Sequence, residues 1–158
     1  MNNPKVDSTA RGVCAGLVAT CSLAAVLIVT RAVGVMSHID LVAILAHALG
    51  SHSLAVGWSA HFFVGTLLWG PLFAWADRRS RYTHWVNGLA FGSVVWLGVM
   101  LVIMPLAGAG LFGLALGVAT PTLTLFLHWV YGAVLGIVYG ALKPGMWTIG
   151  PGHRLRHA

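Results

Sequence analysis

The sequence contains no glutamate, and its only acidic residues are Asp7, Asp40 and Asp77. Chemistry that depends on a pair of carboxylates, such as glycoside hydrolysis, is therefore excluded. None of the three aspartates falls inside an apolar run long enough to cross a bilayer. This argues against a carboxylate proton relay within a membrane.

Charged residues of either sign are scarce. They make up 8% of the 158 residues, whereas 58% are hydrophobic and the mean hydropathy is +0.87. Soluble domains carry about 25% charged residues, so this composition indicates a protein that lies in lipid. The net charge of +6 does not indicate nucleic acid as a partner, because the basic residues flank the apolar runs instead of forming a stripe.

Cysteine is also rare, and both copies, Cys14 and Cys21, lie in the first apolar run. Two cysteines seven residues apart on one straight helix cannot meet, so we expect no disulfide. This run is also too long for the apolar core of a cleavable signal peptide.

Four apolar runs are long enough to cross a bilayer as helices, at about 20 residues each. They lie at about 12–33, 54–75, 85–106 and 121–142. The sequence thus predicts an all-α integral membrane protein, a four-helix bundle forming one membrane domain over residues 1–158, with a cytoplasmic tail at 143–158.

A shorter helix is expected at about 38–49, between the first two spans. Ser37 and Asp40 have the spacing of a capping box, and Gly50 is a natural stop. Such a helix is about 18 Å long, too short to cross the bilayer, so it should lie in the interface.

The basic residues predict the orientation. All but one lie before the first span, between the second and third, or after the fourth: Lys5, Arg11, Arg78, Arg79, Arg81, Lys143, Arg154 and Arg156. Only Arg31 lies on the other side. By the positive-inside rule, both termini are cytoplasmic.

The two halves of the chain resemble each other at an offset of 67 residues. HFFVG at 61–65 matches HWVYG at 128–132, so His61 aligns with His128 and Gly65 with Gly132. The tripeptide Ala-Leu-Gly at 48–50 recurs at 115–117. We expect two repeats, each a span, a short interfacial helix and a span, with a second interfacial segment at 108–117. Chance similarity between two Gly- and Leu-rich segments is the alternative.

His61 and His128 are the first candidate site, because intramembrane histidines usually face the interior of a bundle. In the repeat they lie at matched depth and can face each other. They could be axial ligands of a b-type haem, with Gly65 and Gly132 clearing space for the macrocycle, or ligands of a metal ion. Alternatively, each imidazole only bonds to a backbone carbonyl or a neighbouring side chain while the glycines let helices approach.

A second candidate set lies at the outer side of the membrane and combines thioether with imidazole ligands, which suits copper. It consists of Met36, His38, His47, His52, Met100 and Met104. The alternative is that the methionines fill gaps in the core and the histidines are merely solvated.

The glycines at 132, 136 and 140 recur every four residues, as do the pairs 88/92 and 12/16. Such spacing is typical of tight helix–helix contact, within the chain or with a partner. Gly132, Gly136 and Gly140 therefore predict association with other membrane subunits or with a second copy of the chain.

Residues 12–142 resemble an uncharacterised group of small bacterial four-span membrane proteins. The similarity rests on RAVGVMSHIDLVAILA, AVGWSAHFFVGTLLWGPLFA, MPLAGAGLFGLALG and LHWVYGAVLGIVYG. The resemblance implies a bacterial inner-membrane location and the multi-pass topology, and no catalytic residue.

No nucleophile–base pair or phosphate loop is visible, so we expect no enzyme activity from the chain alone. The leading hypothesis is a non-catalytic accessory subunit of a larger bacterial respiratory or other redox complex in the membrane. The alternatives are an electron carrier with haem b between His61 and His128, and a copper-handling or small-solute transport protein using the outer set.

Overall fold

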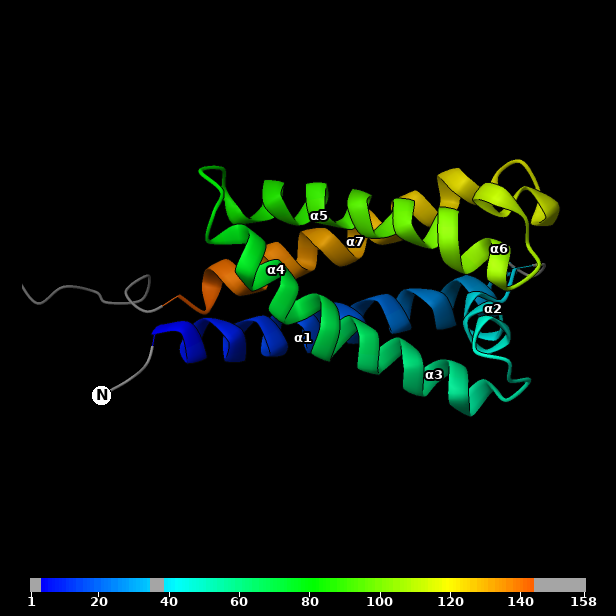
Figure 1. Cartoon of the computed structure of the whole chain (residues 1–158), viewed down its shortest axis with the longest axis horizontal. Helices are drawn as coiled ribbons and strands as arrows, with labels where there is room; N and C mark the ends of the chain where they lie inside the picture. Colours follow the sequence, from blue (N-terminus) through cyan, green and yellow to red (C-terminus); the bar gives the residue numbers. More distant parts are fainter. Residues whose placement is uncertain (1–3, 35–38, 144–158) are drawn as a thin grey trace, which may run out of the picture.

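The computed structural model describes residues 4–34 and 39–143, which contain helices and no strand (Figure 1). Two regular helices are long: α1 (Pro4–Ala32) and α7 (Thr120–Ala141). A short helix, α2 (Leu41–Ala48), follows α1. The all-helical prediction is thereby confirmed for this part of the chain.

Two further rods are helical throughout but change their hydrogen-bond register midway. The first consists of α3 (Leu54–Phe63), the π-helix η1 (Val64–Trp69) and α4 (Gly70–Asp77). The second consists of α5 (His84–Gly98), the π-helix η2 (Val99–Ile103) and α6 (Met104–Leu106). The residues at the junctions keep right-handed helical dihedral angles, so neither rod is broken.

Among the described residues, three helical segments are long and apolar enough to cross a membrane: Asp7–Ala32, His84–Leu106 and Thr120–Ala141. They cover the first, third and fourth expected spans. The second, expected at 54–75, lies in the rod Leu54–Asp77, which runs along α1. This rod carries His61, Pro71 and three tryptophans, which make it less apolar than the others.

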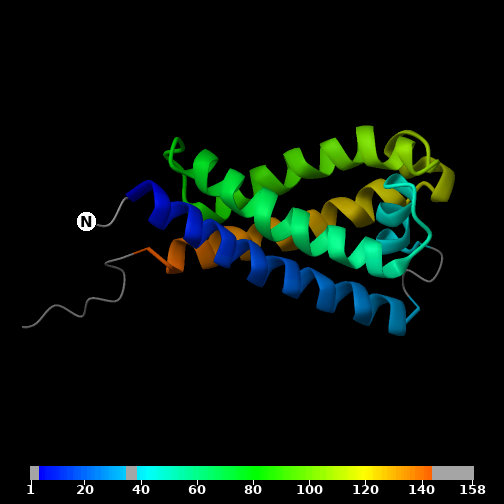
Figure 2. The same cartoon turned by 60° about the horizontal axis from the view of Figure 1, so that its bottom comes forward.

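The rods lie roughly along one axis, and the chain reverses direction at each end (Figure 1). The start of α1, the α4–α5 loop and the end of α7 lie at one end of the bundle. At the other end α2 lies close to α6, and Figure 2 shows the same arrangement from a second side. Within the bundle, α1 packs against α7 and the α3–α4 rod, and α5 packs against α7.

Glycine pairs allow the closest of these helix contacts. A Cβ on Gly12 would meet the carbonyl oxygen of Gly70, and one on Gly132 would overlap that of Gly88. Without side chains, the backbones approach closely and gain dispersion contacts along their length. Gly136 and Gly140 face His84, so all three glycines of the repeated face on α7 contact α5 of the same chain.

The short helix differs in its bounds from the one expected at about 38–49. It begins at Leu41, and Asp40 is its N-cap, accepting a hydrogen bond from the Ala43 amide at 3.0 Å. Ser37, the expected cap, lies outside the described residues. An aspartate at the N-cap satisfies an amide that would otherwise lack an intrahelical partner.

The segment expected at 108–117 is not an α-helix. It contains a tight 3₁₀ turn, η3 (Leu111–Leu116), interrupted by left-handed backbone at Phe112 (φ 56°) and Gly113 (φ 68°). Gly108, Gly110 and Gly117 also have positive φ. Glycine adopts these angles without steric cost. The glycine-rich segment 108–117 therefore forms a turn, whereas the corresponding segment of the first half forms the helix α2.

Candidate functional site: a cavity between His61 and His128

A partly open cavity of about 220 Å³ lies between α1, α2, the α3–α4 and α5–α6 rods, and α7. Aliphatic side chains form most of its wall, mainly Leu, Ile and Val residues. The polar and aromatic members of the wall are Thr20, His61, Trp69, Thr124, His128 and Tyr131. A nearly apolar chamber with a few polar groups is the usual form of a small-molecule site.

His128 is held by its own helix. Its Nδ1 lies 2.7 Å from the backbone oxygen of Thr124, one turn earlier in α7. A carbonyl oxygen can only accept, so Nδ1 carries the proton. In the neutral ring, Nε2 therefore carries the lone pair.

His61 reaches the same cavity from α3. Its Nε2 atom is buried and has no hydrogen-bond partner. Trp58 contacts the ring edge-on, at 5.8 Å between centroids. The imidazoles of His61 and His128 both line this cavity. The structure thus brings the two predicted histidines to one site.

Tyr131 ties α7 to the opposite wall. Its hydroxyl donates to the carbonyl oxygen of Gly65 at 2.6 Å. The hydroxyl of Thr20 donates to the Gly16 oxygen at 2.7 Å. Both of these donors are used within the fold, whereas the Nε2 atom of His61 has no partner.

Both π-helices contribute to the cavity wall. Val64, Gly65 and Trp69 come from η1, and Val99 and Ile103 from η2. A π-helical turn inserts one residue into an α-helix and re-aims the side chains around it, and such turns are frequent at functional sites. No pattern in the sequence indicates these segments, because a π-turn has no composition signal of its own.

The two glycines predicted to accompany the histidines have packing roles. A Cβ on Gly65 would overlap the Thr20 hydroxyl, and one on Gly132 would overlap the Gly88 carbonyl. Gly65 also lines the cavity. The lack of a side chain at Gly65 and Gly132 therefore leaves no space wide enough for a haem macrocycle.

The structure separates the members of the predicted outer set. His47 and His52 are exposed at the end of α2, with 3.1 Å between Nε2 of His47 and Nδ1 of His52. Met100 and Met104 are fully buried, and Met104 lines the cavity. Met36 and His38 lie outside the described residues. Within residues 4–34 and 39–143, no group of three or more His, Cys, Asp or Glu side chains could hold a metal ion.

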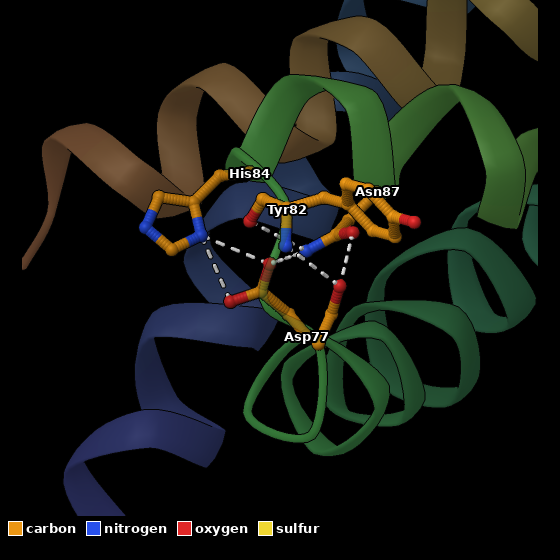
Figure 3. A network of polar contacts seen from close by, with 5 residues as sticks. Asp77, Tyr82, His84 and Asn87 are labelled. Carbon is orange, nitrogen blue, oxygen red and sulfur yellow. Dashed lines mark hydrogen bonds and ion pairs between the residues drawn. The ribbon is translucent and has the colours of Figure 1, made fainter.

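A polar cluster around the buried Asp77 lies at the α4–α5 loop, and no motif in the sequence indicates it (Figure 3). Asp77 is only 4% exposed, and both carboxylate oxygens lie 2.9 Å from Nδ1 of His84. Asn87 donates to the same carboxylate at 2.7 Å, and Ser80 donates to Asn87 at 2.7 Å. Asp77 is seven residues from His84 and ten residues from Asn87. These spacings indicate a contact only once the geometry of the loop is known.

The cluster continues toward α1 through an aromatic ring. The His84 imidazole contacts Tyr139 edge-on at 5.9 Å, and the Arg11 guanidinium lies 5.3 Å from the centre of the same ring. Tyr139 is fully buried. This end of the bundle is therefore joined by polar and cation–π contacts from α1, α4, α5 and α7.

Comparison with known families places the chain in a family of unknown function, DUF6789, which it matches over residues 6–147. The chain belongs to this family. No curated protein and no solved structure matches it.

Proposed function

We propose that this chain is a four-span membrane protein that binds a small apolar ring molecule bearing hydroxyl groups, such as a quinol head group, in the cavity between His61 and His128. It would act as an accessory subunit of a larger redox complex in the bacterial inner membrane. The observation that carries the proposal is the convergence of two imidazoles from α3 and α7 on one mainly apolar cavity.

The length of the α3–α4 rod supports the fourth span. Residues 54–77 make 24 helical residues (77 − 54 + 1), or about 36 Å at 1.5 Å per residue, enough for a hydrocarbon core of about 30 Å. The rod packs along α1, which is itself apolar enough to span.

The charges support cytoplasmic termini. Arg11 lies over the ring of Tyr139 near the end of α7, the arginines at 78, 79 and 81 lie in the α4–α5 loop, and Lys143 follows α7. The start of α1, this loop and the end of α7 lie at the same end of the bundle (Figure 1). Arg31 lies at the end of α1, toward the opposite face. The positive-inside rule assigns the first of these ends to the cytoplasm.

The packing pattern supports an internal duplication. At the offset of 67 residues Gly65 corresponds to Gly132, and each packs against the first helix of its own half: Gly65 meets the Thr20 side chain on α1, and Gly132 meets Gly88 on α5. His61 and His128 then occupy the second helix of each half. The two halves of the chain therefore resemble the parallel repeats of other membrane proteins.

The size of the cavity favours a single ring. Its volume of about 220 Å³ is closer to the roughly 150 Å³ that holds benzene in an engineered cavity than to the roughly 1,000 Å³ at the upper end of ligand pockets. The aliphatic wall favours an apolar ring over a sugar or a nucleotide, because an unpaired polar group is costly to bury there.

His128 favours a ligand that donates a hydrogen bond. With Nδ1 of His128 donating to Thr124, its Nε2 can only accept while the ring is neutral. A quinol offers two hydroxyl donors on opposite sides of one ring, whereas a quinone offers two acceptors. The cavity should therefore bind the reduced form more tightly.

Haem b is the second candidate, and the His128 anchor favours it. Metal-ligating histidines usually donate their other nitrogen to a carbonyl or carboxylate, as His128 does. Two neutral imidazoles are also the axial ligands of many b-type haems. Against it, a four-pyrrole macrocycle exceeds the volume of the cavity, so the helices would have to separate.

In the proposed accessory role, this chain binds the quinol, and a partner subunit carries out the electron transfer. The glycines at 132, 136 and 140 already contact α5 of the same chain. Association with other subunits would therefore use the apolar surface of the bundle, which includes Phe126 and Ile137 on the outer side of α7.

The test is a ligand titration of the purified full-length protein in lipid nanodiscs. Quenching of tryptophan fluorescence by a short-chain quinol should saturate, since Trp69 lines the cavity. The matched quinone should bind at least tenfold more weakly. The variants H61A and H128A should each lose quinol binding, and T122A, an exposed position on α7, should retain it.

The same sample separates the alternatives. A Soret band that disappears in either histidine variant would replace the quinol proposal with the haem proposal. Equal binding by wild type, H61A and H128A would refute both. Gentle co-purification followed by mass spectrometry tests the accessory role, which requires larger membrane subunits in stoichiometric amounts.

A further inference from the structure

Two exposed imidazoles stand side by side where α2 ends. His47 lies in the last turn of the helix and His52 in the loop after it. Nε2 of His47 and Nδ1 of His52 are 3.1 Å apart, and the ring centroids are separated by 4.9 Å with the planes 72° apart. This pair is at the surface, away from the wall of the cavity between the helices.

The backbone builds this arrangement through a Schellman motif. The Ser51 amide donates to the Ala46 oxygen and the Gly50 amide to the His47 oxygen, both at 2.9 Å. This pair of bonds requires left-handed backbone at Gly50, whose φ is +72°. The reversal returns the chain toward the helix, and Ser51 then accepts a hydrogen bond from the Ser53 amide at 3.2 Å.

The nitrogen separation matches chelation of one metal ion. Imidazole nitrogens bind Zn²⁺ at about 2.0–2.1 Å, so two of them at 90–110° around one ion lie about 2.9–3.4 Å apart. The observed 3.1 Å is within this interval. Because both rings are exposed, an ion can arrive without disturbing the core, and water can fill its remaining positions.

We propose that His47 and His52 form a two-imidazole site for a divalent transition-metal ion, with Cu²⁺ bound more tightly than Zn²⁺. Neutral imidazole suits both ions, and at a given nitrogen site the affinity for Cu²⁺ exceeds that for Zn²⁺. Of the six residues in the predicted outer set, the site uses only these two. It does not depend on the ligand of the cavity between the helices.

A hydrogen bond between the two neutral rings would have the same nitrogen separation. The two arrangements differ in what they predict on adding metal. A chelating pair gives one bound ion per chain, with nitrogen hyperfine splitting from two imidazoles in the electron paramagnetic resonance spectrum of Cu²⁺. A simple hydrogen-bonded pair gives neither.

The test uses tag-free, full-length protein in nanodiscs, titrated with Cu²⁺ alone and with Zn²⁺ alone. We expect one Cu²⁺ per chain. The variants H47A and H52A should each weaken Cu²⁺ binding at least tenfold and lose one nitrogen from the spectrum. T122A, at an exposed position on α7, should bind Cu²⁺ as the wild type does.

A backbone variant tests the positioning. G50A keeps both ligands, and a Cβ at Gly50 meets no atom within 4 Å, but alanine disfavours φ of +72°. It should weaken Cu²⁺ binding, and G50N should restore part of the affinity because asparagine tolerates this conformation. Unchanged Cu²⁺ affinity in both H47A and H52A, or no binding to the wild type, would overturn the proposal.

Discussion

Asp77 and His84, on either side of the α4–α5 loop, are joined through both carboxylate oxygens of Asp77, each 2.9 Å from Nδ1 of His84. The aspartate side chain is 1% exposed and the histidine side chain 29%. The contact links a buried carboxylate to a side chain that reaches the surface. It closes the loop between two helices and holds His84 against Gly140.

Removing this carboxylate should destabilise the fold. In D77A, His84 and Asn87 lose their shared acceptor, and loss of a hydrogen bond to a charged group costs about 1.5–3 kcal/mol. D77N should cost less, because its amide oxygen can still accept from Asn87. Thermal unfolding in detergent measures the difference.

The exposed ion pair between Arg31 and Asp40 is the matched control for this experiment. Arg31 is 68% exposed, and surface pairs contribute about 0–1 kcal/mol, so R31A should hardly change the melting temperature. If R31A destabilises the protein as much as D77A, the buried cluster has no special role.

Adding a methyl group at Gly132 should separate α7 from α5. Its Cβ would overlap the carbonyl oxygen of Gly88, and backbone atoms cannot move aside cheaply. Overpacking of this kind costs about 1–3 kcal/mol. The free energy of unfolding of G132A, measured by titration with a denaturing detergent, should fall accordingly.

G98A provides the control on a helix of the same bundle. A Cβ at Gly98 meets nothing within 4 Å, so the substitution adds surface without a clash. It should leave stability unchanged or raise it slightly, since alanine favours helices more than glycine does. Equal destabilisation by G98A and G132A would contradict the assigned contact.

The Tyr131 hydroxyl should matter for stability and for the shape of the cavity. Y131F removes the 2.6 Å hydrogen bond to Gly65 and leaves a π-helical carbonyl without this donor. Hydrogen bonds between membrane helices contribute about 0.6 kcal/mol on average, so the loss should be of this size. Amide hydrogen exchange should increase along Val64–Trp69 and remain unchanged in α5.

Two substitutions of Asp40 distinguish the contribution of the N-cap of α2 from that of the ion pair with Arg31. D40N retains a side-chain oxygen for the Ala43 amide but loses the charge facing Arg31. D40A loses both, and loss of an N-cap costs about 0.5–2 kcal/mol. Hydrogen exchange in Leu41–Ala48 should therefore rise in D40A more than in D40N, and equal exchange would show that the cap contributes little.

Several features could be predicted from residues close in the sequence. The apolar runs predicted helices, and the helical prediction is confirmed, with three segments long and apolar enough to span. Gly50 predicted the end of the short helix, and it is the left-handed residue after α2. The offset of 67 residues paired His61 with His128, and the structure brings both to one cavity, although which ligand they bind stays a prediction.

Other features depend on contacts between distant segments and could not be predicted. Asp77 lies just outside the second expected span, yet its carboxylate is buried because α5 returns His84 and Asn87 to it. The glycines of α7 could equally have faced a partner, and they pack against α5. The segment 108–117 aligned with a helix but forms a turn, since its glycines adopt positive φ.

The sequence by itself determined the helices, the solvent in which they lie and the end at which positive charge gathers, because these follow from local hydrogen bonding and from the polarity of consecutive side chains. Only the tertiary structure decided which glycines touch, where two helices take up a π-turn, and that two imidazoles share one cavity. These depend on the fit of backbones and side chains from different helices, which no local pattern specifies.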